Sequence, residues 1–388
     1  MRLYPPGDAG LSMDARRRGL EDVVIGTSAV SWVGGETGQL SYRGYDIADV
    51  VGHLGYEATA HLLVVGTPPA RDPPIDLVRD LASRRGLPPS VEAVVDALDR
   101  RTLPMDALRT GISAGGIVGN PYPPTLEQGL DLISRAPTVL ARFERRRRGL
   151  PPVPPDPELG HVANFLKMVE GADTDPIRVW ALESYFDIVA DHGMNASTFA
   201  LRVVLSTNSD LVSAASAAIG ALKGPLHGGA PEQVLDQLDR VREVPDVAGW
   251  IAEALARKER LMGFGHRAYK VEDPRAQLLR EIAEKVARPD RFRQAHQFEE
   301  LALEDLRRRR PDQRLNTNVE FYAAIVLEAV GLPRDLFPPT FALARTAGWV
   351  AHALEQVRDN RLIRPEVDYT GPSGLRIPAT YPRRDLGN

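Results

Sequence analysis

The sequence contains no cysteine, which excludes disulfide scaffolds, zinc ribbons, iron–sulfur clusters and cysteine nucleophiles. It has no run close to the roughly 18 apolar residues of a membrane-spanning helix, and its N-terminus lacks the apolar stretch of a signal peptide. A formal net charge of −4 argues against a surface built to bind nucleic acid. We therefore expect a cytoplasmic protein with neither membrane nor nucleic acid as partner.

Lysine is scarce, at five of the 48 basic residues. Arginine and lysine are interchangeable at most exposed positions, so the bias is more consistent with genomic base composition than with chemistry. Lys223 and Lys270 nevertheless fall within two histidine-containing segments, which mildly favours a specific role for each.

The 388 residues are 43% apolar and 26% charged, as in a globular protein of two or three domains. Residues 23–43 carry β-branched and aromatic residues around the turn GGETG, which predicts one small hairpin. Helical spacing of apolar residues recurs in DIADVVGHLGYEATAHLL, SVEAVVDALDRR, TLEQGLDLISRAPTVLARFERRR, DLVSAASAAIGAL, EQVLDQLDRV and LARTAGWVAHALEQVRDNRL. Proline clusters separate these segments. The sequence predicts an all-α fold with a small N-terminal β-hairpin.

One predicted helix, residues 209–222, is rich in alanine and glycine where larger residues are usual. Small side chains let a second helix approach the backbone closely. The segment therefore fits a tight helix–helix or subunit interface, and it fits a plain buried alanine-rich helix equally well.

Three of the eight histidines, His192, His227 and His266, stand among small or conformationally permissive residues, in DHGMN, KGPLHGG and GFGHR. Flanking glycines permit positive φ and close approach of a ligand, which a core histidine does not need. None has metal-ligand spacing such as HxxxH, so a metal site is not expected. The other histidines occupy ordinary helical or loop patterns and are interpreted as structural or exposed.

Two further positions combine charge with apolar surroundings. Glu320 enters the apolar run FYAAIVLEAVGL, where burial would raise the pKa of its carboxyl group and its strength as a base. The alternative is that Glu320 is a structural carboxylate whose hydrogen bonds are satisfied within the protein. Arg345 in FALARTAGW offers a planar fork to a carboxylate, or forms an internal salt bridge.

The segments KGPLHGGAPEQV, GFGHRAYKVEDPR, NVEFY, FALARTAGW and NRLIRP occur in this order, preceded by LSYRGYDI and ADHGMNAST. This series resembles the successive motifs of the citrate synthases, and 2-methylcitrate synthases share it. The resemblance covers about residues 20–370.

The resemblance implies an all-α, two-domain homodimer. A large domain, residues 1–227 and 326–388, would carry a small domain, residues 228–325, that closes over oxaloacetate and acetyl-CoA. No metal or prosthetic group is implied. By similarity, His227 would stabilise the enol of acetyl-CoA, His266 would polarise the oxaloacetate carbonyl, and Glu320 would be the base.

The resemblance also implies substrate-binding residues. Oxaloacetate would be held by His192, Asn195, Arg275, Arg345 and, from across a subunit interface, Arg364. The phosphates of CoA would meet Lys270 and Arg314.

Two residues depart from the family pattern. The family base is an aspartate in an NVDFY-like motif, whereas Glu320 is one methylene longer, and misplacement by about 1 Å can cost on the order of 100-fold in rate. Val189 stands where the family has a histidine beside His192.

A Claisen condensation needs a carboxylate and two hydrogen-bond donors that converge, and this chain offers them. We therefore expect an acyltransferase that condenses acetyl-CoA with oxaloacetate and water to give citrate and CoA. Two alternatives stay open. One is a paralogue that uses propionyl-CoA or another acyl-CoA or 2-oxo acid; the other is a catalytically weakened protein that binds oxaloacetate and CoA.

Overall fold

The computed structural model describes residues 18–20, 23–70, 75–116, 121–228, 230–266, 268–311, 315–378 and 380–381. The chain divides into two compact units. One, Ser28–Leu362, holds the sheet and the α-helices found in these described ranges. The other combines Met1–Thr27 with Ile363–Asn388, and its described part contains the short 3-10 helix η2, Arg18–Leu20.

The sheet has three antiparallel strands in the order β1 (Ser31–Gly34), β2 (Gln39–Tyr42) and β3 (Tyr45–Asp46). Val33 pairs with Leu40, and the connecting turn includes Gly38 with φ 68°, a conformation that glycine adopts without strain. The predicted hairpin is confirmed. The third strand was not expected, because two residues are too short to show a strand pattern.

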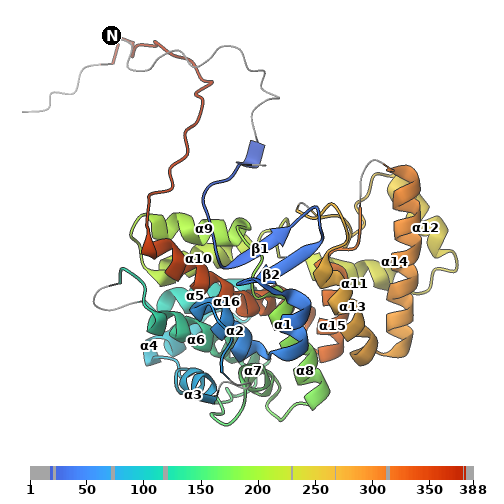
Figure 1. Ribbon diagram of the computed structural model, residues 1–388, viewed down its shortest axis with the longest axis horizontal. Helices are drawn as coiled ribbons and strands as arrows, with labels where there is room; N and C mark the ends of the chain where they lie inside the picture. Colours follow the sequence, from blue (N-terminus) through green and yellow to red (C-terminus); the bar gives the residue numbers. More distant parts are fainter. Residues whose placement is uncertain are drawn as a thin grey trace, which may run out of the picture. The chain divides into compact units, whose positions relative to one another are not determined.

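Helices account for most of the remaining described residues (Figure 1). The first ten are α1 (Ile47–His53), α2 (Tyr56–Val65), α3 (Ile75–Ser83), α4 (Pro89–Ala97), α5 (Pro104–Ala114), α6 (Leu126–Arg147), α7 (His161–Glu170), α8 (Pro176–Val189), α9 (Ala196–Ser206) and α10 (Leu211–Leu222). The rest are α11 (Ala230–Arg240), α12 (Val247–Ala256), α13 (Pro274–Val286), α14 (Pro289–Arg309), α15 (Val319–Val330), the 3-10 helix η3 (Arg334–Leu336) and α16 (Phe337–Arg358).

Local chemistry explains many of the helix starts. Side-chain oxygens of Asn195, Asp273 and Asn318 cap α9, α13 and α15, which are the helices nearest the candidate residues. Proline occupies the first turn of α4, α5, α8, α13 and α14, where its missing N–H costs nothing. The single helix predicted over residues 46–63 is in fact two, because the chain is extended at Leu54 and Gly55.

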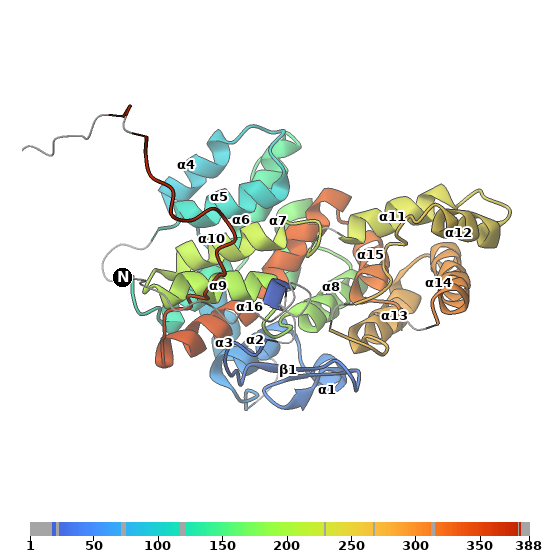
Figure 2. The ribbon, with the colours of Figure 1, turned by 90° about the horizontal axis from the view of Figure 1, so that it is seen from above.

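Helix α16 lies in the middle of the helical unit and packs on α2, α6, α8 and α9 (Figure 2). The side chain of Trp349 on this helix is fully buried. Helices α11 to α14 lie together at one end, on the far side from α4 and α5 (Figures 1 and 2). Helices α13 and α15 pack on α8 and so join that end to the rest of the unit. The predicted all-α fold is confirmed.

None of the helices in the described ranges combines the length and the apolar character that crossing a membrane requires.

The contact between α6 and α16 predicts a stability effect. A Cβ at Gly129 would lie 2.4 Å from Cγ1 of Val350, so Gly129→Ala overpacks the core and should lower the free energy of unfolding by about 1–3 kcal/mol. Gly52 in α1 has open space around it, so Gly52→Ala should raise it by about 0.5–1 kcal/mol. Urea denaturation measures both. A neutral or stabilising Gly129→Ala would contradict this packing.

Candidate active site

The loop that carries His266 is fixed to the segment leading into Glu320. The Asn318 N–H donates to the carbonyl of Gly263 at 2.9 Å, and the Gly265 N–H donates to the carbonyl of Asn316 at 2.8 Å. Gly263 and Gly265 have φ of 88° and 83°. A Cβ at Gly263 would also lie 2.6 Å from the Phe321 ring, so the sequence signal of flanking glycines marks a real conformational need.

His266 is held as a hydrogen-bond donor. The backbone N–H groups of Ala268 and Tyr269 donate to its Nδ1 at 3.0 and 3.1 Å. Nδ1 faces two N–H donors, whereas Nε2 faces one more distant donor, Nη2 of Arg275 at 3.3 Å, so the ring proton is assigned to Nε2 and the Arg275 approach is not a hydrogen bond. Burial, and then the Arg275 guanidinium, lower the pKa of His266 to about 4. The ring is therefore neutral at pH 7 and presents an N–H.

His192 lies beside His266, with ring centroids 5.4 Å apart and nearly perpendicular. Its Nε2 is 3.3 Å from the hydroxyl of Tyr269. Burial, followed by Arg275 and His266, lowers the pKa of His192 well below its ordinary value, so this ring is also neutral. The structure thus brings together two of the three predicted histidines.

The third, His227, meets the start of α9. Its Nε2 lies 2.9 Å from the Ser197 hydroxyl and 3.2 Å from Oδ1 of Asn195, and it accepts the Ser197 N–H at 3.3 Å. That bond makes Nε2 an acceptor and assigns the proton of the neutral ring to Nδ1, so the approach of Nε2 to Oδ1 of Asn195 is not a hydrogen bond. Burial, and then Arg345, lower the pKa of His227 to about 4.

Two of the four predicted arginines, Arg275 and Arg345, differ in their partners. Arg275 is buried and forms a bidentate pair with Asp273, through Nε at 3.0 Å and Nη2 at 2.8 Å, and its Nη2 lies 3.3 Å from Nε2 of His266. Arg345 donates Nε to the carbonyl of Val189 at 2.7 Å, and its guanidinium lies over the Phe341 ring.

Nη1 of Arg345 is buried and has no hydrogen-bond partner among the described residues. Within the same residues Arg345 forms no ion pair with a carboxylate. A buried, unpaired N–H of this kind is costly unless an anion occupies the site. The internal salt bridge considered for Arg345 is therefore not what the structure contains.

Glu320 begins α15, where its N–H donates to Oδ1 of Asn318 at 3.0 Å. In the described part of the chain no hydrogen bond or ion pair holds its carboxylate. Burial raises the pKa of Glu320 to about 7, although Arg275 and Arg345 act in the opposite direction. A carboxylate without a partner and with such a pKa suits proton transfer near neutral pH.

The remaining predicted residues lie elsewhere. Lys270 is exposed and pairs with Glu36 of the β1–β2 turn at 2.5 Å. Arg364 belongs to the other compact unit, so its position relative to the site is not defined. Arg314 lies outside the described residues.

Sequence reasoning missed four residues that order the site. Tyr269 and Asp273 stand in the segment GFGHRAYKVEDPR, and Asp191 and Ser197 flank His192 and Asn195. Asp273 holds Arg275 and also accepts the Val319 N–H at 3.3 Å, next to Glu320. Their closeness to the histidines in sequence was the available signal, but only the fold shows which atoms they meet.

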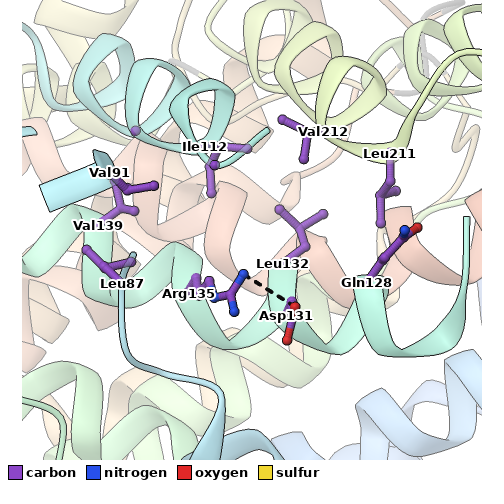
Figure 3. A pocket seen from close by; sticks show the side chains of 12 residues that line it. Leu87, Val91, Ile112, Gln128, Asp131, Leu132, Arg135, Val139, Leu211 and Val212 are labelled. Carbon is purple, nitrogen blue, oxygen red and sulfur yellow. Dashed lines mark ion pairs between the residues drawn. The ribbon is translucent and has the colours of Figure 1, made fainter. Parts of the chain in front are cut away.

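A separate pocket lies between α4, α5, α6 and α10 (Figure 3). Aliphatic side chains, among them Val91, Ile112 and Val212, line most of it, and the Arg135–Asp131 ion pair stands at one side. The lining residues include none of the candidates, so this pocket is not part of the histidine site.

Known proteins resemble this chain in sequence and in fold. Residues 19–366 match the family model for the citrate synthase C-terminal domain. Citrate synthase 2 of Bacillus subtilis is 40% identical over 362 residues, which cover 92% of this chain and 96% of that protein. The chain belongs to the citrate synthase family. A citrate synthase of Haloferax volcanii is 39% identical and matches 92% of this chain and 97% of its own length.

Solved structures of this family superpose on the chain. The crystal structure of citrate synthase from Thermotoga maritima has a TM-score of 0.85 at 34% identity, over 94% of this chain and 98% of that one. The citrate synthase of the archaeon Thermoplasma acidophilum, solved with carboxymethyl coenzyme A and oxaloacetate, has a TM-score of 0.86 at 29% identity, over 93% of this chain and 98% of that one.

The raised pKa of Glu320 predicts how stability depends on pH. Because the folded-state pKa of about 7 exceeds the ordinary 4.5, the stability linked to the protonated carboxyl is fully present below 4.5 and is lost as pH rises through 7. Glu320→Gln does not titrate. Its melting temperature should therefore exceed that of the wild type by more at pH 8 than at pH 5.

Glu284→Gln, at an exposed position on α13 with no ion pair among the described residues, is the control and should show no such change between the two pH values. An equal difference for Glu320→Gln at both pH values would mean that Glu320 has an ordinary pKa.

Proposed function

We propose that the chain condenses acetyl-CoA with oxaloacetate and water to give citrate and free CoA. The observation that carries this proposal is the Glu320 carboxylate, which is unpartnered in the described structure and has a pKa near 7. Membership of the citrate synthase family supports it. No observation favours the 2-methylcitrate reaction over this one.

In the proposed first step, Glu320 removes a proton from the methyl group of acetyl-CoA. The Nδ1–H of neutral His227 donates to the thioester oxygen, where negative charge develops as the enol forms. A neutral histidine can perform this task because one of its ring nitrogens carries an N–H that donates a hydrogen bond.

In the second step, the enol carbon attacks the oxaloacetate carbonyl and a carbon–carbon bond forms. Nε2–H of His266 donates to the carbonyl oxygen and supplies the proton that the new alkoxide takes. Water then hydrolyses the thioester: its OH bonds to the carbonyl carbon, the carbon–sulfur bond breaks, and its other proton leaves on CoA as the thiol. The proton that Glu320 took up returns to His266, which restores both groups.

Oxaloacetate carries two carboxylates, and the site offers cations for them. Nη1 of Arg345 is buried and free to donate among the described residues, and Arg275 and His192 lie beside His266. Asn195, which lies beside His227, and Arg364 from a second subunit complete the proposed set. Lys270 and Arg314 would meet the phosphates of CoA. To do so, Lys270 has to leave its ion pair with Glu36 and bind a phosphate instead.

We further propose a cytoplasmic homodimer whose small domain, residues 228–325, closes on a large domain of residues 1–227 and 326–388. No metal or prosthetic group enters the proposed reaction. The face of α10 formed by Ala217, Gly220 and Ala221 is only partly covered within the chain, which supports a helix of a second subunit packing there. The opposite face, with Ala214 and Ala218, is buried within the chain.

Release of free thiol from acetyl-CoA on addition of oxaloacetate tests the reaction directly, and the cysteine-free chain adds no background. Glu320→Gln keeps the shape of the side chain but removes its basicity, so turnover should fall by about 100-fold or more. Glu284→Gln should retain wild-type turnover. Propionyl-CoA in place of acetyl-CoA should give the slower reaction.

Absence of thiol release from the wild type, despite binding of oxaloacetate and CoA, would identify a binding protein instead. Near-normal turnover of Glu320→Gln would show that Glu320 is structural and that the proposed mechanism is wrong.

Sharing of the site between subunits predicts complementation. Arg364→Ala and His266→Ala should each be nearly inactive, but after mixing and subunit exchange some heterodimer sites hold both native residues and activity should reappear. Measuring thiol release before and after exchange checks this. No recovery, with heterodimers verified by mass spectrometry, would place Arg364 outside the neighbouring site.

A further inference from the structure

Four buried or half-buried polar residues form a connected network behind the candidate site. Asp191 precedes His192, Arg202 lies on α9, and His352 and Glu355 lie on α16. His352 and Asp191 are fully buried, and Arg202 is almost so. The proposed reaction uses none of the four, and burying so many ionisable groups is costly unless each is paired.

The contacts in this network of four residues are continuous. Arg202 pairs with Glu355 and donates Nε and Nη2 to Nδ1 of His352 at 3.2 and 2.9 Å. Nε2 of His352 lies 3.3 Å from Oδ1 of Asp191. Since arginine can only donate, Nδ1 of His352 accepts, and the proton at Nε2 points to Asp191.

Asp191 in turn fixes the backbone around His192. Its Oδ2 accepts the Ser31 hydroxyl from β1 and the Gly193 N–H at 2.9 Å. Gly193 has φ of 57°, so the turn is in the left-handed region directly after His192. Burial alone would raise the pKa of Asp191, but His352, Arg345 and Ser31 outweigh it and lower this pKa to about 2, so the carboxylate stays charged.

Helix α16 presses against the same turn. A Cβ at Gly348 would lie 2.3 Å from the carbonyl oxygen of Ala190 and 2.5 Å from Oδ1 of Asp191. No side chain fits there without a shift of the backbone. The contact leaves the Asp191 carboxylate directly accessible to His352, one helical turn further along α16.

The turn held in this way carries two of the proposed substrate-contacting groups. The ring centroids of His192 and His266 are 5.4 Å apart, and Oδ1 of Asn195 lies 3.2 Å from Nε2 of His227. A displacement of the turn therefore moves His192 directly and His227 through Ser197, which donates to both Asn195 and His227. A shift of about 1 Å is enough to cost on the order of 100-fold in rate.

We propose that Asp191 and His352 are positioning residues, which lock the turn carrying His192 and Asn195 and so set oxaloacetate binding and turnover from behind the site. This inference rests on the proposed function. It assigns no substrate contact to either residue, because both are buried behind the histidines that face the substrate.

The test compares two substitutions at His352. In His352→Gln the amide donates to Asp191 and its oxygen accepts from Arg202, whereas His352→Leu keeps the bulk and loses both contacts. We expect His352→Leu to raise KM for oxaloacetate and to lower kcat, each by about 10-fold, and His352→Gln to restore most of both. Kinetics of thiol release and circular dichroism are measured on each variant.

Two further variants keep the outcome decisive. Ser31→Ala removes one bond to Asp191 from the partly exposed sheet and should give a smaller rise in KM for oxaloacetate even if His352→Leu does not fold. Glu144→Gln breaks a buried ion pair with Arg147 on α6 and should lower stability while leaving KM and kcat unchanged.

Unchanged KM and kcat in folded His352→Leu would overturn the inference. If His352→Leu does not fold, unchanged values in Ser31→Ala would do the same. The four polar residues would then have a structural role alone. Calorimetry of oxaloacetate binding to the wild type separates this from failure of the proposed function. A wild type that binds oxaloacetate and releases thiol upholds the function whatever the variants do.

Discussion

Removal of water from a few ionisable side chains determines what the site can do. Burial lowers the pKa values of His227 and His266 to about 4 and raises that of Glu320 to about 7. The same physical cause therefore supplies two neutral donors and one base whose pKa matches neutral pH. The cations at Arg275 and Arg345 reinforce the effect on the histidines and keep Glu320 from titrating still higher.

The fold produces this environment by bringing helix starts together: α9 packs on α16, and α13 and α15 pack on α8, which itself packs on α16. The starts of α9, α13 and α15 carry Asn195, Arg275 and Glu320, and each is fixed by a cap within two residues. Glycines let the His266 loop approach Phe321 and let α16 approach the turn before His192. The groups are thus positioned by backbone that cannot move far, as a Claisen condensation requires.

The all-α fold, the hairpin and the three histidines could be predicted because their signals are local: apolar periodicity, turn residues and flanking glycines. The orienting contacts could not. That Asp273 holds Arg275 and the start of α15, or that His352 meets Asp191 across 161 residues, follows from the fold alone. His352 was interpreted as structural or exposed because its helical pattern is ordinary. The roles of Arg314 and Arg364 and the two-domain division stay predictions.

The central claim is that Glu320 is the base and that burial sets its pKa. The dependence of kcat/KM for acetyl-CoA on pH, at saturating oxaloacetate, tests it most directly, since the pKa values of His227 and His266 near 4 keep both rings out of that range. The account predicts a plateau above about pH 7.5 and a tenfold fall per pH unit below about 6.5. A profile that is flat from pH 5.5 to 8.5 would contradict it.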